Sequence, residues 1–135
     1  MNVRVFSRLL AVFLLASTGG RQFAVAATPE QLLAQYSAQA GRTAAPERGQ
    51  AVFTSRHTGT WSCASCHGAP PTGLGQHVVT GRPIQPLAPA FNRERFTDAD
   101  KVEKWFRRNC NDVLGRECVA SEKADVLSWL IKFKP

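Results

Sequence analysis

Hydrophobic and polar positions follow helical spacing in four segments after residue 27, and a long stretch rich in proline and glycine interrupts them. The first segment opens with the helix-start residues Thr28 and Pro29, keeps its apolar side chains on one face and ends at Gly41. A second helix is predicted to begin near Pro46. On its buried face, Gly49 would allow another helix to approach closely.

The stretch from Gly68 to Phe96 contains proline and glycine residues that exclude a long helix or a central strand: Pro70, Pro71, Gly73, Gly75, Gly81, Pro83, Pro86 and Pro89. A loop of this length is rare without a function, and wrapping a large ligand is one such function. Thr97 is predicted to cap a helix of about a dozen residues, and Ser121 to cap the last helix. Strand signals are absent, so the sequence predicts an all-α fold.

Residues 1–27 are predicted to form a secretory signal peptide that is removed. Arg4 and Arg8 precede a short apolar run, and Ala24-Val25-Ala26 supplies the small-x-small pattern for cleavage after residue 26 or 27. The run is too short to span a bilayer comfortably, and no cysteine follows it for a lipid anchor. Residues 28–135 are therefore expected to be one domain, exported to the periplasm and without a membrane anchor.

Length and charge exclude several classes of protein. A chain of 135 residues with 44% hydrophobic and 20% charged residues is typical of one globular domain. The 17 lysines and arginines and 10 acidic residues give a net charge of +7, and three of the arginines lie in the predicted signal peptide. The remaining +4 is interleaved with acids and is too small to indicate a nucleic-acid-binding protein.

The motif Cys63-Ala64-Ser65-Cys66-His67 carries the main chemical signal. At this spacing, each thiol can add to one vinyl group of a haem, and the adjacent histidine can ligate the iron. A structural disulfide, a redox dithiol or half of a zinc site are the alternatives. A redox dithiol usually lies in a βαβ setting, and a zinc site would need further ligands close by. The motif therefore indicates covalent haem c in a class I-like cytochrome c fold.

The usual sixth ligand of that class, methionine, is missing because Met1 is the only methionine. The remaining candidates are His57, His77, Asn109, a lysine or no residue. Asn109 continues the apolar stripe of a helix together with Val102, Trp105 and Phe106. A large apolar stripe is a costly place for an unpartnered amide. The simpler interpretation is an asparagine bonded to its own backbone.

Cys110 and Cys118 are left over once Cys63 and Cys66 hold haem, and in an oxidising compartment such a pair normally closes. Gly115 lies between them and can form the turn. A disulfide here would fix the helix beside Asn109, or would only stabilise a small domain. The two interpretations are compatible.

The remaining histidines and cations have weaker signals. His57 is expected to lie on the surface or to bond a haem propionate rather than to ligate iron. His77 lies in the proline-rich loop, where a hydrogen bond at the haem edge is favoured over distal ligation. One helix face carries cations that either face solvent or dock a redox partner: Lys101, Lys104, Arg107 and Arg108.

Several motifs together resemble the SHP-type cytochromes c: Cys63–His67, Thr80–Ile84, Pro86–Pro89, Arg95–Asp98, Lys101–Trp105, Arg108–Asn111, Gly115-Arg116 and Cys118. The resemblance runs from about Thr28 to the C-terminus. It implies that Cys63 and Cys66 bind the haem, that His67 is the proximal ligand and that Asn109 is a distal ligand released on reduction. It also implies a Cys110–Cys118 disulfide. The related cytochrome c″ branch has histidine at the position of Asn109.

This resemblance implies a redox-active monohaem protein whose ferrous iron binds O₂, NO or CO. Its electrons would come from other c-type or membrane cytochromes. Two alternatives stay open from the sequence. One is a plain electron carrier, in which the ligand change only tunes the potential. The other is an enzyme that reduces a small ligand such as NO or peroxide.

Overall fold

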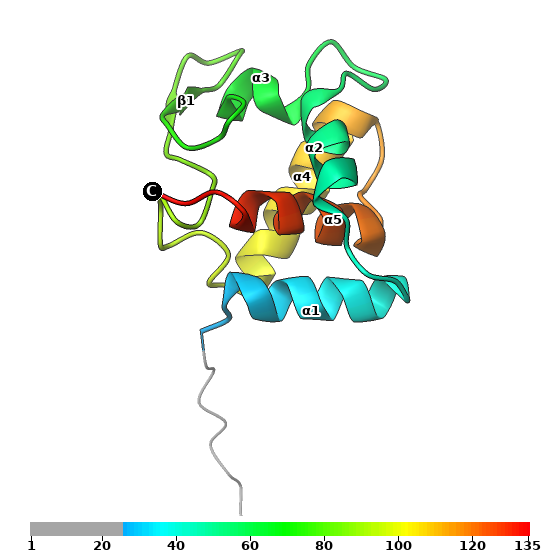
Figure 1. Ribbon diagram of the computed structural model, residues 1–135. Helices are drawn as coiled ribbons and strands as arrows, with labels where there is room; N and C mark the ends of the chain where they lie inside the picture. The colour runs from blue at the N-terminus through cyan, green and yellow to red at the C-terminus, as the bar shows by residue number, and fades with distance from the viewer. Residues whose placement is uncertain (1–25) are drawn as a thin grey trace, which may run out of the picture.

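The computed structural model describes residues 26–135, so the predicted signal peptide lies outside it except for its last two residues. Five helices form the frame: α1 (Pro29–Ala40), α2 (Pro46–Thr54), α3 (Cys63–His67), α4 (Ala99–Leu114) and α5 (Ala120–Ile131). Helix α5 packs against both α1 and α2, and Figure 1 shows a long loop extending from α3 around one side of the helices to α4. Among the described residues, no helix is long and apolar enough to cross a membrane.

The proline-rich loop contains the only departure from the helical pattern in the described chain. Strands β1 (Gly75–Gln76) and β2 (Pro83–Ile84) pair antiparallel, with Gly75 opposite Ile84. The expectation of no strand signal is therefore corrected by one short hairpin. Its strands have two residues each, which is too short for an alternating hydrophobic pattern to appear in the sequence.

Helix α1 begins and ends as its sequence predicts. The Thr28 hydroxyl accepts a hydrogen bond from the Gln31 N–H at 3.2 Å, and the Gln31 side chain accepts one from the Thr28 N–H at 2.9 Å. Gly41 ends the helix with a left-handed φ of 64°, a conformation that glycine adopts without a steric penalty. Helix α2 begins at Pro46, also as predicted.

The starts of α4 and α5 differ from the predicted ones. Asp98 caps α4 by accepting a hydrogen bond from the Lys101 N–H at 3.0 Å, whereas the Thr97 hydroxyl donates back to the carbonyl of Glu94. Helix α4 also has 16 residues rather than about a dozen. Helix α5 begins at Ala120, so the predicted cap Ser121 lies inside its first turn.

The Glu122 side chain explains the earlier start of α5. Its carboxylate accepts a hydrogen bond from the Val119 N–H at 3.0 Å, which occupies a donor that the start of the helix would otherwise leave free. The same carboxylate forms an ion pair with Arg116 at 2.7 Å. The Glu122 side chain, at the third position of the helix, therefore takes the capping role that the sequence predicted for Ser121.

Helices α2 and α5 cross at Gly49, as the sequence predicts. A β-carbon at Gly49 would collide with the backbone carbonyl of Asp125 on α5. The Asp125 side chain is 3% exposed. It accepts hydrogen bonds from Arg42 at 2.7 Å, from Arg48 at 2.9 Å and from the Ala45 N–H at 2.7 Å. One buried carboxylate thus ties α5 to the α1–α2 connection and to α2.

Two groups of buried residues stabilise this frame. The larger joins α1, α2, α4 and α5: Leu32, Tyr36, Phe53, Phe96, Val102, Ala124, Val126, Leu127, Trp129 and Leu130. The smaller lies at the C-terminal end of α4: Cys110, Val113, Leu114 and Cys118. Cys63 and Phe106 pack against both groups, so the start of α3 lies where they meet.

Candidate haem-binding site

Helix α3 brings the two thiols and the histidine of the motif onto little more than one helical turn. Its start is fixed by Ser62 and Ser65, because the Ser62 N–H donates to the Ser65 hydroxyl at 3.0 Å. All four cysteines lie within the described residues, and Cys63 and Cys66 are unpaired and half-buried. Burial raises the pKa of the Cys63 thiol to about 11. The two sulfurs of the motif are not joined to each other in this structure.

The His67 imidazole lies against the core and has a free nitrogen. Its ring centroid lies 6.2 Å from that of Phe53, which in turn lies 4.9 Å from that of Trp129 on α5. Its Nδ1 is buried and has no hydrogen-bond partner among residues 26–135. Burial, with a smaller contribution from the Arg95 charge, lowers the pKa of His67 to about 4. The imidazole is therefore neutral at ordinary pH, which is the form that ligates metals.

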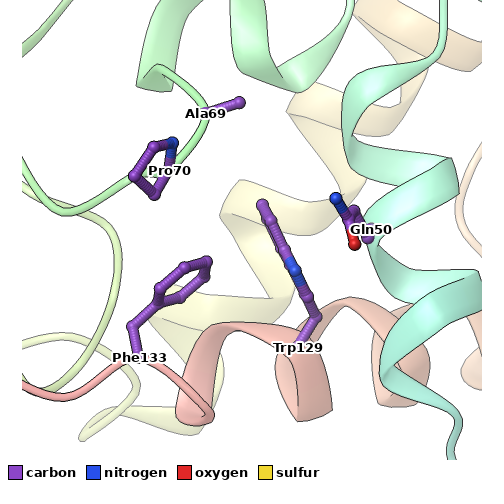
Figure 2. A pocket seen from close by; sticks show the side chains of 5 residues that line it. All are labelled: Gln50, Ala69, Pro70, Trp129 and Phe133. Atoms are coloured by element: carbon purple, nitrogen blue, oxygen red, sulfur yellow. The ribbon is translucent and has the colours of Figure 1, made fainter.

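The chain after His67 turns back against α3. The backbone of Gly75 in β1 lies so close to Cys66 and His67 that a β-carbon there would collide with the Cys66 carbonyl. A cavity of about 440 Å³ lies between this turn and the helices, lined by Gln50, Ala69, Pro70, Trp129 and Phe133. Figure 2 shows Trp129 and Phe133 on one side of it and the Ala69–Pro70 turn facing them.

Arg95 braces the far part of the loop. Its guanidinium donates to the carbonyl of Pro86 at 2.9 Å and to that of Gln85 at 2.8 Å. The N–H groups of Leu87 and Ala88 both donate to the Pro71 carbonyl, at 3.1 and 3.0 Å. Backbone hydrogen bonds therefore join residues 87 and 88 of the loop to Pro71 near its start. The Arg95 side chain joins the end of the loop to residues 85 and 86.

Helix α4 carries Asn109 in its middle, at the expected phase but with a different exposure pattern. Val102 is buried and Phe106 is half-buried, whereas Trp105 is 45% exposed. The side chain of Asn109 is half-buried. Asn111, two residues later, donates to the carbonyl of Arg107 at 2.8 Å. Asn111 thus bonds the backbone of its own helix.

A disulfide joins Cys110 to Cys118, with a Cα–Cα distance of 5.5 Å. It confirms the pairing expected from the leftover cysteines. Gly115 ends α4 with a left-handed φ of 71°, as expected for the turn between them. Since Cys110 follows Asn109 directly, the bridge restrains the backbone that carries the Asn109 amide. Cys63 packs against the same cluster, so α3 and this part of α4 are neighbours.

The two other histidines have local roles. His57 is exposed and its Nε2 lies 3.0 Å from the carbonyl of Val52, at the end of α2. The Nδ1 of His77 accepts hydrogen bonds from the N–H groups of Val79 and Thr80, both at 3.3 Å. His77 thus closes the turn of the β1–β2 hairpin. This role could not be predicted from the sequence, because it depends on a hairpin that the hydrophobic pattern does not reveal.

The cations predicted to share one face of α4 are exposed: Lys101, Lys104, Arg107 and Arg108. The Arg108 guanidinium lies over the ring of Trp105, at 5.7 Å from its centroid. This stacking covers part of an exposed aromatic side chain. No three His, Cys, Asp or Glu side chains come together as a metal site in the part of the chain that the structure describes.

Comparison with known proteins agrees with this geometry. A family model described as a domain of unknown function, DUF1924, matches residues 39–130. The cytochrome c-type protein SHP of Cereibacter sphaeroides is 50% identical over 123 residues, which cover 88% of this chain and 95% of that protein. The chain belongs to the DUF1924 family as an SHP-type cytochrome c. The solved structure of oxidised SHP, described as an oxygen-binding cytochrome c, matches with a TM-score of 0.74 and 52% identity, covering 78% of this chain and 96% of that one.

Cytochrome c″ of Methylophilus methylotrophus is a further relative of this SHP-type cytochrome. It is 51% identical over 70 residues, which are 52% of this chain and 49% of that protein. Its oxidised structure matches with a TM-score of 0.70 and 37% identity, over 79% of this chain and 95% of that one. These likenesses confirm the predicted all-α cytochrome fold and identify haem c as the cofactor.

The residues present fit this cofactor. The two free thiols of α3 suit thioether attachment, and the neutral imidazole of His67, whose Nδ1 has no partner in the described chain, suits iron ligation. The sequence predicted a haem-binding role for these three residues. It missed Phe53 and Trp129, which support the His67 ring, and Arg95, because their roles arise from helix crossings and loop closure rather than from a motif.

Proposed function

We propose that this SHP-type cytochrome is exported and binds one haem through Cys63 and Cys66, with His67 as the proximal ligand. In the ferric state, Asn109 is the distal ligand. On reduction, Asn109 leaves and the ferrous site accepts O₂ or another diatomic ligand. Haem c supplies an iron that changes oxidation state and can hold a sixth ligand. The printed description of SHP as an oxygen-binding cytochrome c supports the ligand class.

The observation that carries the proposal is the position of Asn109 on α4, half-buried on the face of Val102 and Phe106 and next to the Cys110–Cys118 disulfide. The side chain of Asn111, two residues later, donates to the helix carbonyl of Arg107 at 2.8 Å. An amide oxygen is a weak, hard ligand that suits Fe(III) better than the softer Fe(II). Asn109 therefore has a reason to be held near iron in one oxidation state and to leave in the other.

The disulfide supports a release that does not disrupt the helix. Cys110 is tied to Cys118, and Gly115 ends α4 immediately before this bridge closes. The backbone beside Asn109 is thus restrained, and release requires only a rotation of the side chain. Val102 and Phe106 on the same face keep the surroundings apolar, which favours a neutral diatomic ligand over water.

The test compares Asn109→Ala with the matched control Asn111→Ala in holoprotein. Removal of the ligand should give a ferric absorption and EPR spectrum that changes with pH, because water or hydroxide takes its place. The ferrous Asn109→Ala protein should still bind CO quickly. Asn111→Ala should retain the wild-type ferric spectrum and CO kinetics.

Asn109→His gives the opposite perturbation. Imidazole binds Fe(II) far better than an amide does, so this variant should be low-spin in the ferric state and should bind CO more slowly when reduced. If the Asn109→Ala and wild-type ferric spectra coincide at the same pH, the distal ligand is another residue and this assignment is wrong.

A further inference from the structure

Ala27 ties the N-terminal end of the described chain to the segment that leads into α4. Its N–H donates to the carbonyl of Thr97 at 3.0 Å. Ala27 is half-buried and packs against the larger buried group, whereas Ala26, one residue earlier, is exposed. Figure 1 shows the start of α1 beside the segment that leads into α4. Ala27 is therefore part of the folded domain, directly before the α1 cap Thr28.

The segment that Ala27 contacts includes a strained residue. Phe96 has a left-handed φ of 62°, which is a costly conformation for a residue with a bulky side chain. It is 8% exposed and belongs to the larger buried group. Such a conformation persists only where the surrounding contacts enforce it. On one side of Phe96, the Arg95 side chain bonds the loop carbonyls, and on the other, Thr97 accepts the bond from Ala27.

The two cleavage positions that the sequence allows differ in whether they keep this contact. Cleavage after Ala26 leaves Ala27 as the first residue, with an amino group that can still donate to the Thr97 carbonyl. Cleavage after Ala27 removes the donor and its apolar contact together. The small-x-small pattern Ala24-Val25-Ala26 ends at the first of these positions. The sequence pattern and the contact thus favour the same position.

Acidic residues at the start of α4 suit a positively charged amino terminus. Ala27 lies two residues before α1 and Thr97 two residues before α4, so the ammonium group would lie near two helix N-termini, where a cation is unfavourable. Asp98 caps α4, and Asp100 lies in its first turn. Their carboxylates offset the helix dipole and make the position acceptable for an ammonium group.

We propose that the signal peptide is cleaved between Ala26 and Ala27 and that the new α-amino group binds the Thr97 carbonyl. The amino terminus of the mature protein then holds the strained junction at Phe96, directly before the helix that carries the proposed ligand Asn109. The inference rests on the export that forms part of the proposed function, because only an exported chain meets signal peptidase.

The first test is the intact mass of holoprotein expressed with its own signal in a bacterial host that attaches haem c in the periplasm. The mass should equal residues 27–135 plus haem. Ala24→Leu puts a large side chain where the proposed site needs a small one, so it should block or move cleavage. The matched control Val25→Leu lies at the tolerant middle position and should be processed as wild type. The reverse pattern, or a wild-type protein that begins at any residue other than Ala27, would overturn the proposal.

The second test addresses the binding of the amino group. A heterologous signal placed before residue 27 or before residue 28 gives two holoproteins, each verified by mass. Loss of one hydrogen bond should raise the equilibrium constant of unfolding in guanidinium by roughly fivefold in the protein that begins at Thr28. Ala27→Gly keeps the amino group and removes only the methyl group, so it should lose less stability than that protein. Equal stability of the two starts, or equal losses in Ala27→Gly and the shorter protein, would overturn the docking of the amino group.

The mass measurement also separates this inference from the proposed function. A chain that retains residues 1–26 and carries no haem c would refute the proposed export, and this inference with it. A haem-containing protein that begins at Thr28 would overturn this inference alone, since export and haem attachment would be intact.

Discussion

Replacement of Gly49 by alanine sets two physical effects against each other. Helix propensity alone predicts that Gly49→Ala stabilises α2 by about 0.5–1 kcal/mol. The structure predicts the opposite sign, because the new methyl group would collide with the Asp125 carbonyl. Overpacking of a core contact costs about 1–3 kcal/mol. A clash between the new β-carbon and the Asp125 backbone carbonyl cannot be relieved by a change of rotamer. The collision involves two backbones, so we take the overpacking cost near the upper end of its range, about 3 kcal/mol. Subtraction of the propensity gain of about 1 kcal/mol leaves an expected net loss of about 2 kcal/mol in the free energy of unfolding.

Guanidinium unfolding of ferric holoprotein measures this loss as a lower midpoint with an unchanged slope. Ala51→Gly is the control, because Ala51 is exposed on the same helix and should lose about 1 kcal/mol through propensity alone. Phe53 is one turn beyond Gly49 and contacts the His67 ring, so displacement of α2 should also alter the ferric absorption spectrum before unfolding begins. If Gly49→Ala is as stable as wild type or more stable, the tight crossing of α2 and α5 is wrong.

Two other predictions test the ends of α4 and α5. The Arg116 guanidinium holds the pKa of Glu122 below its ordinary value of 4.5, so Glu122 stabilises the fold above that pH and loses this effect as the pH falls through its folded pKa. Glu122→Gln should therefore be less stable at pH 7 by up to about 1 kcal/mol, and the difference from wild type in unfolding titrations should vanish in acid; a constant difference would contradict this. Replacement of both Cys110 and Cys118 by serine should lower the free energy of unfolding by roughly 2–3 kcal/mol. Thiol titration of unfolded, unreduced holoprotein should find no free thiol in wild type, and two free thiols would refute the pairing.

The parts of the fold that the sequence predicted are those with local causes. Thr28 and Gln31 cap each other within one turn, so α1 could be placed to the residue. The close approach at Gly49 could be anticipated because a glycine on an apolar helix face has few other uses. The attachment motif was visible for the same reason: its three reactive residues fall within five consecutive positions.

The parts that the sequence missed depend on partners distant in the chain or on competition between neighbours. The sequence predicts no special role for Asp125, a charged residue on a helix. Its partners Arg42 and Arg48 are about eighty residues away in the sequence and come into contact with it only in the folded chain. Thr97 and Asp98 are both favourable N-cap residues. Asp98 caps α4 because the Thr97 hydroxyl donates to the Glu94 carbonyl instead. Trp105 follows the apolar stripe by periodicity, yet it is the residue of that stripe that stays exposed.

The position of Cys63 between the two buried clusters links the stability of the molecule to its optical signal. Cys63 and Phe106 belong to the packing of both clusters, so neither cluster can loosen without disturbing the other. Substitutions on opposite sides of this junction should show non-additive effects, as contacts that share a partner do. The position of Cys63 also lets the absorption spectrum report on cooperativity. The absorption of a chromophore attached at Cys63 would change when either the larger buried group, which includes Tyr36, or the smaller one, which includes Cys110, loses its order.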